Sequence, residues 1–113
     1  MSIRVPVSEL SSTVPNDAWC YFVTYGTAGA HVLSLRPRWV NGSDMLFAIT
    51  GGRGRENSLA NGSATLVFAP LAEGDLEGYS LIVDVAVSAS DDDVLCTATN
   101  AVWHRPAPDV EPQ

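Results

Sequence analysis

Four arginines gathered in one window of the sequence, residues 31–62, have the type and spacing to do chemistry. The chain has no lysine, and Arg36, Arg38, Arg53 and Arg55 fall inside this window. Against two carboxylates they give the window a net charge of +2, whereas the rest of the chain carries −9, which accounts for the overall −7. Guanidinium groups present a planar fork of donors that matches phosphate oxygens. The window therefore predicts a site for a small phosphorylated ligand, although arginines that only balance nearby acids on a solvated face would give the same pattern.

The local sequence suggests how the two pairs of arginines are presented. Arg36 and Arg38 share one face of an alternating segment, residues 31–39, that predicts a strand. The second pair lies in a run of glycines and arginines, residues 51–55, where the backbone can approach a ligand closely. A short helix is predicted over residues 56–61, and helix N-termini attract anions. The run is not a P-loop, because the Gly-Lys-Ser/Thr ending is missing.

Other polar residues give weaker signals. His31 begins a strand beside a turn and is interpreted as a surface or capping group, while His104 and Arg105 follow the last strand and are expected to be exposed, unless they reach over a site in a dimer. Asp84 is expected to pair with an arginine, and the aspartates at 91–93 to form an exposed turn rather than a cation site. Neither a Ser-His-Asp or Cys-His arrangement nor a metal-ligand spacing is visible.

The two cysteines, Cys20 and Cys96, lie in apolar, strand-like runs. Two isolated cysteines do not form a disulfide framework, and buried free cysteine behaves as a small hydrophobe. Both are therefore predicted to be structural.

The candidate site residues must be positioned by short apolar and aromatic runs that are bounded by turn residues. These runs predict six strands, over residues 19–25, 31–39, 45–50, 64–68, 79–88 and 94–103. A helical turn is also predicted at 8–10, and Gly62 is placed to end the helix at 56–61. The pattern predicts a mainly β fold, a six-stranded antiparallel barrel with one or two short helices, as a single domain over 1–113 with its core at about 19–105 and a proline-rich tail at 106–113.

Composition restricts the partners. With a sequence of 113 residues and a net charge of −7, the chain lacks the basic footprint that nucleic-acid binding needs. No apolar run approaches the roughly 18–20 residues of a membrane span, and the N-terminus does not read as a signal peptide, so a cytoplasmic location is expected. A chain this short gains useful burial from forming a homodimer.

Three segments of this sequence resemble the FMN-binding split-barrel superfamily, the fold of pyridoxamine 5′-phosphate oxidase, over roughly residues 19–105. The first is the hairpin Tyr-Phe-Val-Thr-Tyr-Gly-Thr-Ala-Gly-Ala-His-Val-Leu-Ser-Leu. The second is Arg-Gly-Arg-Glu-Asn-Ser-Leu-Ala-Asn-Gly-Ser-Ala-Thr-Leu-Val-Phe, and the third is Gly-Tyr-Ser-Leu-Ile-Val-Asp-Val-Ala followed by Ala-Val-Trp-His-Arg-Pro. The third segment resembles a short actinobacterial branch that is described only as oxidase-like.

The resemblance implies a split barrel whose two subunits share flavin sites at their interface. By position, basic residues of the second strand and of the loop before the short helix would hold the phosphate. The implied cofactor-binding residues are Arg36, Arg38, Thr50, Arg53, Arg55 and Asn57, with Asn57 in a supporting role. The implied cofactor is FMN, with a deazaflavin or haem as alternatives.

Two positions depart from that pattern, and one segment has no counterpart. Gly62 stands where the family usually has proline, and Val85 where this branch often has glycine. The C-terminal segment that true pyridoxamine phosphate oxidases use for substrate has no counterpart here, which argues against vitamin B6 as substrate. The resulting hypothesis is an FMN- or deazaflavin-dependent oxidoreductase of unknown small-molecule substrate. The alternatives are a carrier that binds flavin, deazaflavin or haem without turnover, and a structural dimer whose site has decayed.

Overall fold

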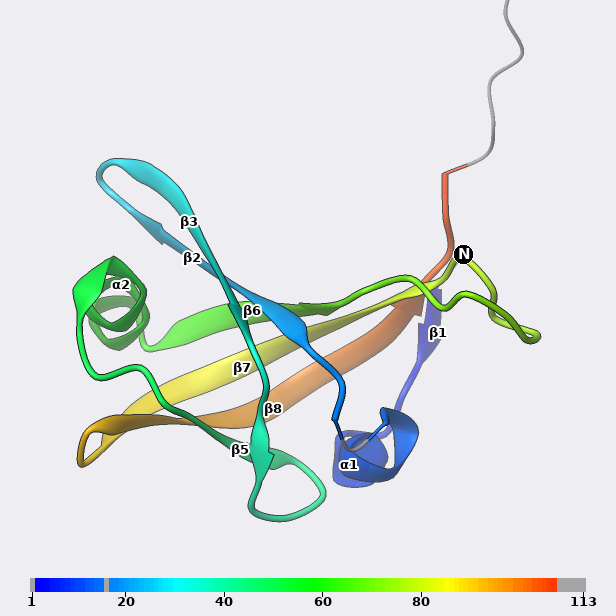
Figure 1. The fold of residues 1–113 in the computed structure, drawn as a ribbon, viewed down its shortest axis with the longest axis horizontal. Helices are drawn as coiled ribbons and strands as arrows, with labels where there is room; N and C mark the ends of the chain where they lie inside the picture. Colours follow the sequence, from blue (N-terminus) through cyan, green and yellow to red (C-terminus); the bar gives the residue numbers. More distant parts are fainter. Residues whose placement is uncertain (1, 16, 108–113) are drawn as a thin grey trace, which may run out of the picture.

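A computed structural model describes residues 2–15 and 17–107 of the chain, and its architecture is one curled antiparallel sheet with short helices at its ends (Figure 1). The strands are β1 (Ser2–Arg4), β2 (Cys20–Gly26), β3 (Gly29–Leu35), β4 (Arg38–Trp39), β5 (Asp44–Phe47), β6 (Ser63–Phe68), β7 (Ser80–Ser90) and β8 (Asp93–His104). The helical elements are the 3-10 turn η1 (Val7–Glu9), α1 (Leu10–Thr13) and α2 (Gly52–Asn61). The predicted mainly β, antiparallel split-barrel fold is confirmed.

The strand order across the sheet is β3-β2-β6-β7-β8-β5-β4, and β1 pairs with β8. The two long strands β7 and β8 form the middle of the sheet, and their register shifts at Asp84/Val85, where a bulge leaves Thr99 without a strand partner. In Figure 1, α2 and the β2–β3 hairpin lie together at one end of the sheet.

The described residues form eight strands rather than six, because β1 is too brief to show an alternation in sequence and the predicted strand at 31–39 is divided into β3 and β4. The predicted strand at 31–39 is interrupted at Arg36 and Pro37, since proline cannot donate to the strand ladder. The predicted helix at 56–61 begins earlier, at Gly52, and includes the whole glycine–arginine run. It ends as expected, with Gly62 in the left-handed conformation at φ 69°. The part of the predicted tail beyond residue 107 lies outside the described residues.

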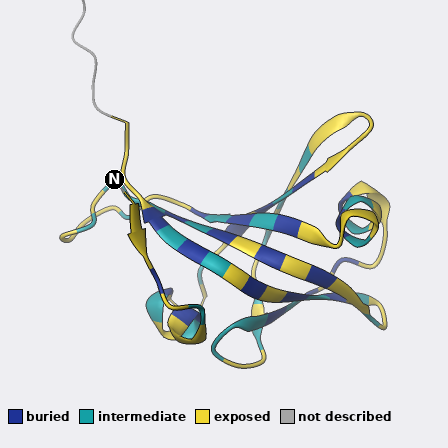
Figure 2. Cartoon of the chain, turned by 180° about the vertical axis from the view of Figure 1, so that it is seen from behind, coloured by how far each residue is buried: buried dark blue, intermediate teal, exposed yellow. Residues whose placement is uncertain are grey.

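The core lies inside the curl of the sheet and follows the period-two pattern. Alternate residues of β7 are buried, as predicted for Leu81, Val83, Val85 and Val87. Figure 2 shows the same banding of buried and exposed positions along the central strands. The rings of Phe22 and Phe47 meet edge to face inside this core, with centroids 5.5 Å apart.

The outer face of the sheet is more open than the sequence suggests. Residues 19–25 show little alternation, which predicts a strand covered on both faces, yet Tyr21 and Tyr25 are 49% and 64% exposed. Tyr21 pairs with Val67, Val67 with Ile82, and Ile82 with Val102, so a row of apolar side chains crosses four neighbouring strands on this face. The apolar run of β2 is therefore explained by an outward-facing apolar surface, on which Tyr21 is exposed while Val67, Ile82 and Val102 are half-buried.

Candidate functional site

The four arginines of residues 31–62 do not converge on one point. The guanidinium carbon of Arg36 lies 5.0 Å from the centroid of the Trp19 ring, which makes a cation–π contact. Arg38 forms an ion pair with Asp93, with 3.1 Å between Nη2 and Oδ2. Arg38 is largely exposed, so this pair contributes little to stability.

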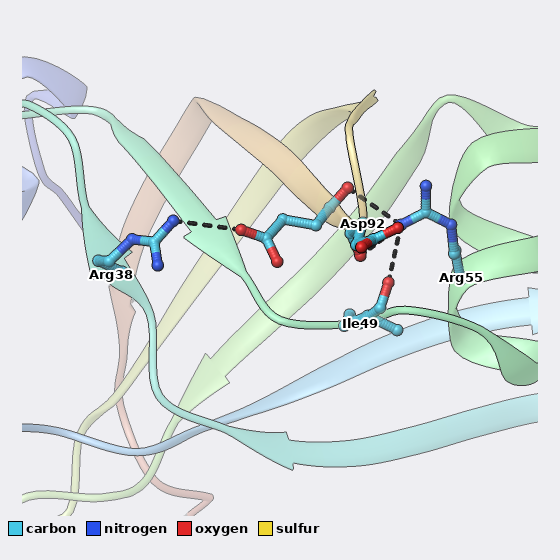
Figure 3. A network of polar contacts seen from close by, with 5 residues as sticks. Arg38, Ile49, Arg55 and Asp92 are labelled. Atoms are coloured by element: carbon cyan, nitrogen blue, oxygen red, sulfur yellow. Dashed lines mark hydrogen bonds and ion pairs between the residues drawn. The ribbon is translucent and has the colours of Figure 1, made fainter.

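Arg55 is held by main-chain carbonyl groups. Its Nη1 donates to the carbonyl oxygen of Ile49 at 2.8 Å and to those of Asp92 and Asp93 at 3.0 Å, and its Nη2 donates to the carbonyl oxygen of Asp91 at 3.0 Å. Figure 3 shows the guanidinium between the segment that carries Ile49 and the turn that carries Asp92. Arg38 and Arg55 therefore meet at one turn, the link between β7 and β8.

Arg53 and Thr50 are exposed at the start of α2. In the described part of the chain, Arg53 has no hydrogen-bond, ion-pair or cation–π partner. The helix cap, Gly51, is extended and makes no side-chain capping bond, and Gly52 follows with φ at 84°. The first N–H groups of α2 are thus left for another acceptor, with a free guanidinium beside them.

Two glycines, Gly26 and Gly54, allow α2 to pack closely against the β2–β3 hairpin. A Cβ atom at Gly54 would come within 2.7 Å of the Leu33 Cδ1 atom, and one at Gly26 would collide with the Asn57 amide. The side chains of Leu33 and Asn57 can therefore pack directly on the backbone of these glycines, which a Cβ at either position would prevent.

The C-terminal half of α2 is tied to β2 by two asparagine side chains. Asn57 Nδ2 donates to the Thr24 hydroxyl at 3.4 Å, and Asn61 Nδ2 donates to the carbonyl oxygen of Tyr25 at 2.8 Å. Thr24 is only 2% exposed, so this contact is made from inside the fold.

A cavity of about 580 Å³ opens between α2 and the hairpin tip, and we call it the hairpin cavity. Its lining includes Tyr25, Thr27, Glu56, Asn57 and Asn61. Asn57 is the one predicted cofactor-binding residue that lines the hairpin cavity. The other five, Arg36, Arg38, Thr50, Arg53 and Arg55, do not line it.

A second cavity of about 300 Å³, the sheet-face cavity, adjoins the first on the outer face of the sheet. Tyr25 and Asn61 line both, and Thr65, Asp84 and Thr99 add polar groups to the second. Sequence reasoning missed Tyr25 and Asn61 because neither residue type signals a site. Asn61 appears in the sequence only as the end of a helix.

Asp84 does not pair with an arginine, contrary to the prediction. Its carboxylate accepts from Asn100 Nδ2 at 3.5 Å, and its carbonyl oxygen accepts from the Thr99 hydroxyl at 3.1 Å. The bulge in β8 brings both donors to Asp84, so amide and hydroxyl groups rather than a guanidinium satisfy it.

The histidines differ from each other in their environments. His31 is half-buried beside α2, 3.6 Å from the position a Cβ at Gly54 would take, and its Nδ1 has no hydrogen-bond partner among the described residues. It is therefore packed against the helix rather than simply exposed. His104 and Arg105 are exposed, as predicted.

Cys20 and Cys96 are buried free thiols, as predicted. Burial raises the pKa of both from 9.0 to about 12, which keeps them protonated and poorly nucleophilic. Among the described residues, no group of three or more His, Cys, Asp or Glu side chains is placed to hold a metal ion. The described helices are also all too short or too polar to span a bilayer.

The fold is similar to those of flavin-related proteins, whereas the sequence alone shows no match to a protein-family model or to a curated protein. A structure named as an F420 reductase shares 17% identity, with a TM-score of 0.58, and the match covers 85% of this chain and 95% of that one. The FAD-binding protein from Mycobacterium smegmatis shares 16% identity, also with a TM-score of 0.58, over 90% of this chain and 95% of that one. At these identities the similarity establishes the fold.

Proposed function

We propose that this protein binds a flavin-type cofactor, FMN or a deazaflavin, at the α2 end of the sheet, and that it does so as a homodimer. The observation that carries the proposal is the pair of adjoining cavities along the second half of α2, the helix whose N-terminus is open. Two structures with this fold are named for F420 and for FAD binding, which supports a cofactor of this class.

The residues present fit such a group. Ligand sites usually occupy about 300–1,000 Å³, and the two cavities have volumes of about 580 and 300 Å³. Tyr25 offers an aromatic surface between them, while Asn57 and Asn61 offer amide groups. Arg53 and the first N–H groups of α2 supply the positive end that a phosphate requires.

The partly exposed outer face supports the proposed homodimer. The row of Tyr21, Val67, Ile82 and Val102 is apolar and continuous across four strands, and such patches mark interaction sites. The sheet-face cavity opens on the same face. A second copy on this face would cover the cavity and exclude water from it, so each site would lie at the subunit interface.

The cofactor would supply the redox chemistry, and this chain would bind and orient it. Arg53 would hold the phosphate, Asn57 would act from the cavity wall, and the partner subunit would close the site. We favour an oxidoreductase of a small molecule. A protein that binds the cofactor without turnover is the alternative, and reduction of the bound cofactor by a nicotinamide or a reduced deazaflavin donor separates the two.

The proposal is tested first by the absorbance spectrum of the purified protein and by thermal melts with FMN, riboflavin, FAD and F420. A ligand at about 100 times its dissociation constant stabilises the folded state by about 2.7 kcal/mol, which corresponds to a rise in Tm on the order of 10 °C. An intense Soret band would instead identify haem. A colourless protein whose melts respond to none of these flavins and deazaflavins would refute the proposal.

The phosphate contact is tested by Arg53→Ala. A charge-assisted hydrogen bond contributes about 1.5–3 kcal/mol, so FMN affinity should fall roughly 10- to 100-fold while riboflavin affinity stays the same. Arg4→Ala, which removes an exposed guanidinium from β1, is the matched control and should change neither. Equal FMN affinities for Arg53→Ala and the unchanged protein would remove Arg53 from the site.

A further inference from the structure

The carbonyl groups around Arg55 form a cation-binding cup made by the turn between β7 and β8. Three of its four members are consecutive, Asp91, Asp92 and Asp93, and Ile49 completes it from the segment before α2. Consecutive carbonyl oxygens rarely converge in regular structure. Here Asp91 has φ at 52°, in the left-handed region that aspartate tolerates better than most residues.

The donors of Arg55 are largely committed to this cup. A guanidinium has five N–H groups, and Nη1 has only two of them for three carbonyl oxygens. Nη2 uses one more on Asp91. Nε–H and the second N–H of Nη2 have no acceptor among the described residues, but a phosphate on that edge would lie close to carbonyl oxygens whose negative ends point at the guanidinium. Arg55 is therefore less well placed as a phosphate ligand than Arg53, which has no such neighbours.

The cup instead links three segments around the first half of α2. Arg55 lies in the first half of α2, Ile49 in the segment that leads into it, and residues 91–93 in the turn at the end of the central strands. The other side-chain bonds from α2 to the sheet, those of Asn57 and Asn61, belong to its second half. Arg55 is therefore the polar anchor of the helix's N-terminal half in the described structure.

We propose that Arg55 is a positioning residue, which fixes residues 49–55 through the carbonyl cup so that Arg53 and the first N–H groups of α2 face the phosphate of the cofactor. This inference rests on the proposed function for its ligand, but the cup itself can be tested without any ligand. The resemblance implies that Arg55 contacts the phosphate directly. In this proposal Arg55 instead holds in place the groups that contact the phosphate.

The experiment compares Arg55→Ala and Arg55→Lys with Arg53→Ala and Arg38→Ala. The first readouts are Tm and amide hydrogen exchange of the ligand-free proteins. Losing the cup should lower Tm by about 10 °C and speed exchange in residues 50–56. Lysine has three donors on one nitrogen and cannot reproduce the planar fork, so Arg55→Lys should recover little. Arg38→Ala breaks an exposed ion pair at the same turn and should change Tm by no more than a few degrees.

The second readout is the ratio of FMN affinity to riboflavin affinity, measured well below each variant's Tm. Arg55→Ala and Arg55→Lys should both lower this ratio about tenfold or more, because the anion site is no longer held in place. A merely structural role would lower Tm and leave the ratio unchanged, which would overturn the proposal. An unchanged Tm with a lowered ratio, largely restored by Arg55→Lys, would identify Arg55 as a direct phosphate ligand and would also overturn it.

Failure of the proposed function is distinguishable from failure of this inference. If the unchanged protein binds none of FMN, riboflavin, FAD and F420, the cofactor proposal fails and the positioning role falls with it, even if exchange and Tm establish the cup. If the unchanged protein binds FMN and Arg55→Ala matches it in exchange, Tm and affinity ratio, the function stands and the positioning role is refuted.

Discussion

The two buried thiols make the stability of this protein depend on alkaline pH. Burial raises the pKa of both Cys20 and Cys96 from 9.0 to about 12, and for Cys96 a charge on Cys20 adds to the effect of burial. Because the folded-state pKa is raised, the folded protein keeps both protons as the pH passes 9, whereas the unfolded chain releases them. The unfolded state then binds two fewer protons, so the free energy of unfolding must fall as the pH rises.

The size of this effect follows from the pKa values. One pKa unit corresponds to about 1.4 kcal/mol, so each thiol reduces the free energy of unfolding by about that amount between pH 7 and pH 10. The two together should cost about 3 kcal/mol, a large part of the roughly 5–15 kcal/mol that stabilises a typical domain. Below pH 8 the thiols should contribute no pH dependence.

The assay is urea unfolding at pH 7, 8, 9 and 10 for the unchanged protein and for a Cys20→Ala, Cys96→Ala double variant. Loss of the two sulfur atoms lowers stability by an amount that does not depend on pH, so the control isolates ionisation. The two curves of stability against pH should run parallel up to pH 8 and converge above pH 9. Curves that remain parallel to pH 10, or native thiols that react with a disulfide reagent at pH 8 as fast as unfolded ones, would refute the reasoning.

Two further predictions concern the outer face of the sheet and the contact between α2 and the β2–β3 hairpin. Val67→Asp places a charge in the apolar row and should convert the proposed dimer to a monomer, as measured by light scattering. Ala72→Asp, in the exposed loop after β6, is the control and should leave the mass unchanged. If both variants remain dimers, this face is excluded as the interface. Gly26→Ala should weaken FMN binding at least tenfold, because its methyl group collides with the Asn57 amide at the hairpin cavity. Equal FMN affinities for Gly26→Ala and the unchanged protein would contradict the placement of the site.

The fold was largely predictable because apolar and polar residues alternate along the strands of the sheet. Alternation in residues 79–88 marks the core face of β7, and the apolar row on the opposite face is what made β2 look covered on both sides. The start of α2 was not predictable. Two glycines within Gly52–Gly54 disfavour a helix by about 1 kcal/mol each, and the contacts that overcome this, at Leu33 and at the carbonyl cup, come from segments distant in sequence.

The candidate site was less predictable than the fold because the partners of its arginines carry no sequence signature. The acceptors of Arg55 are main-chain carbonyls, which every residue has, and three of them lie 36 to 38 positions away. The sequence shows a positive window but not how its charges are used. The cofactor roles of Arg36, Arg38 and Thr50 stay predictions, because none of these residues lines the hairpin cavity or the sheet-face cavity.

The use of these charges bears on which cofactor the site can hold. Three of the four guanidinium groups in residues 31–62 have partners within the chain: Arg36 on Trp19, Arg38 on Asp93 and Arg55 in the carbonyl cup. Arg53 remains for an anion, next to the open end of a single helix. One guanidinium and one helix terminus are matched to one phosphate group, since each supplies only a few directed donors. A pyrophosphate would leave its second charge without a partner from this window, which is why we place FMN before FAD as the first cofactor to test.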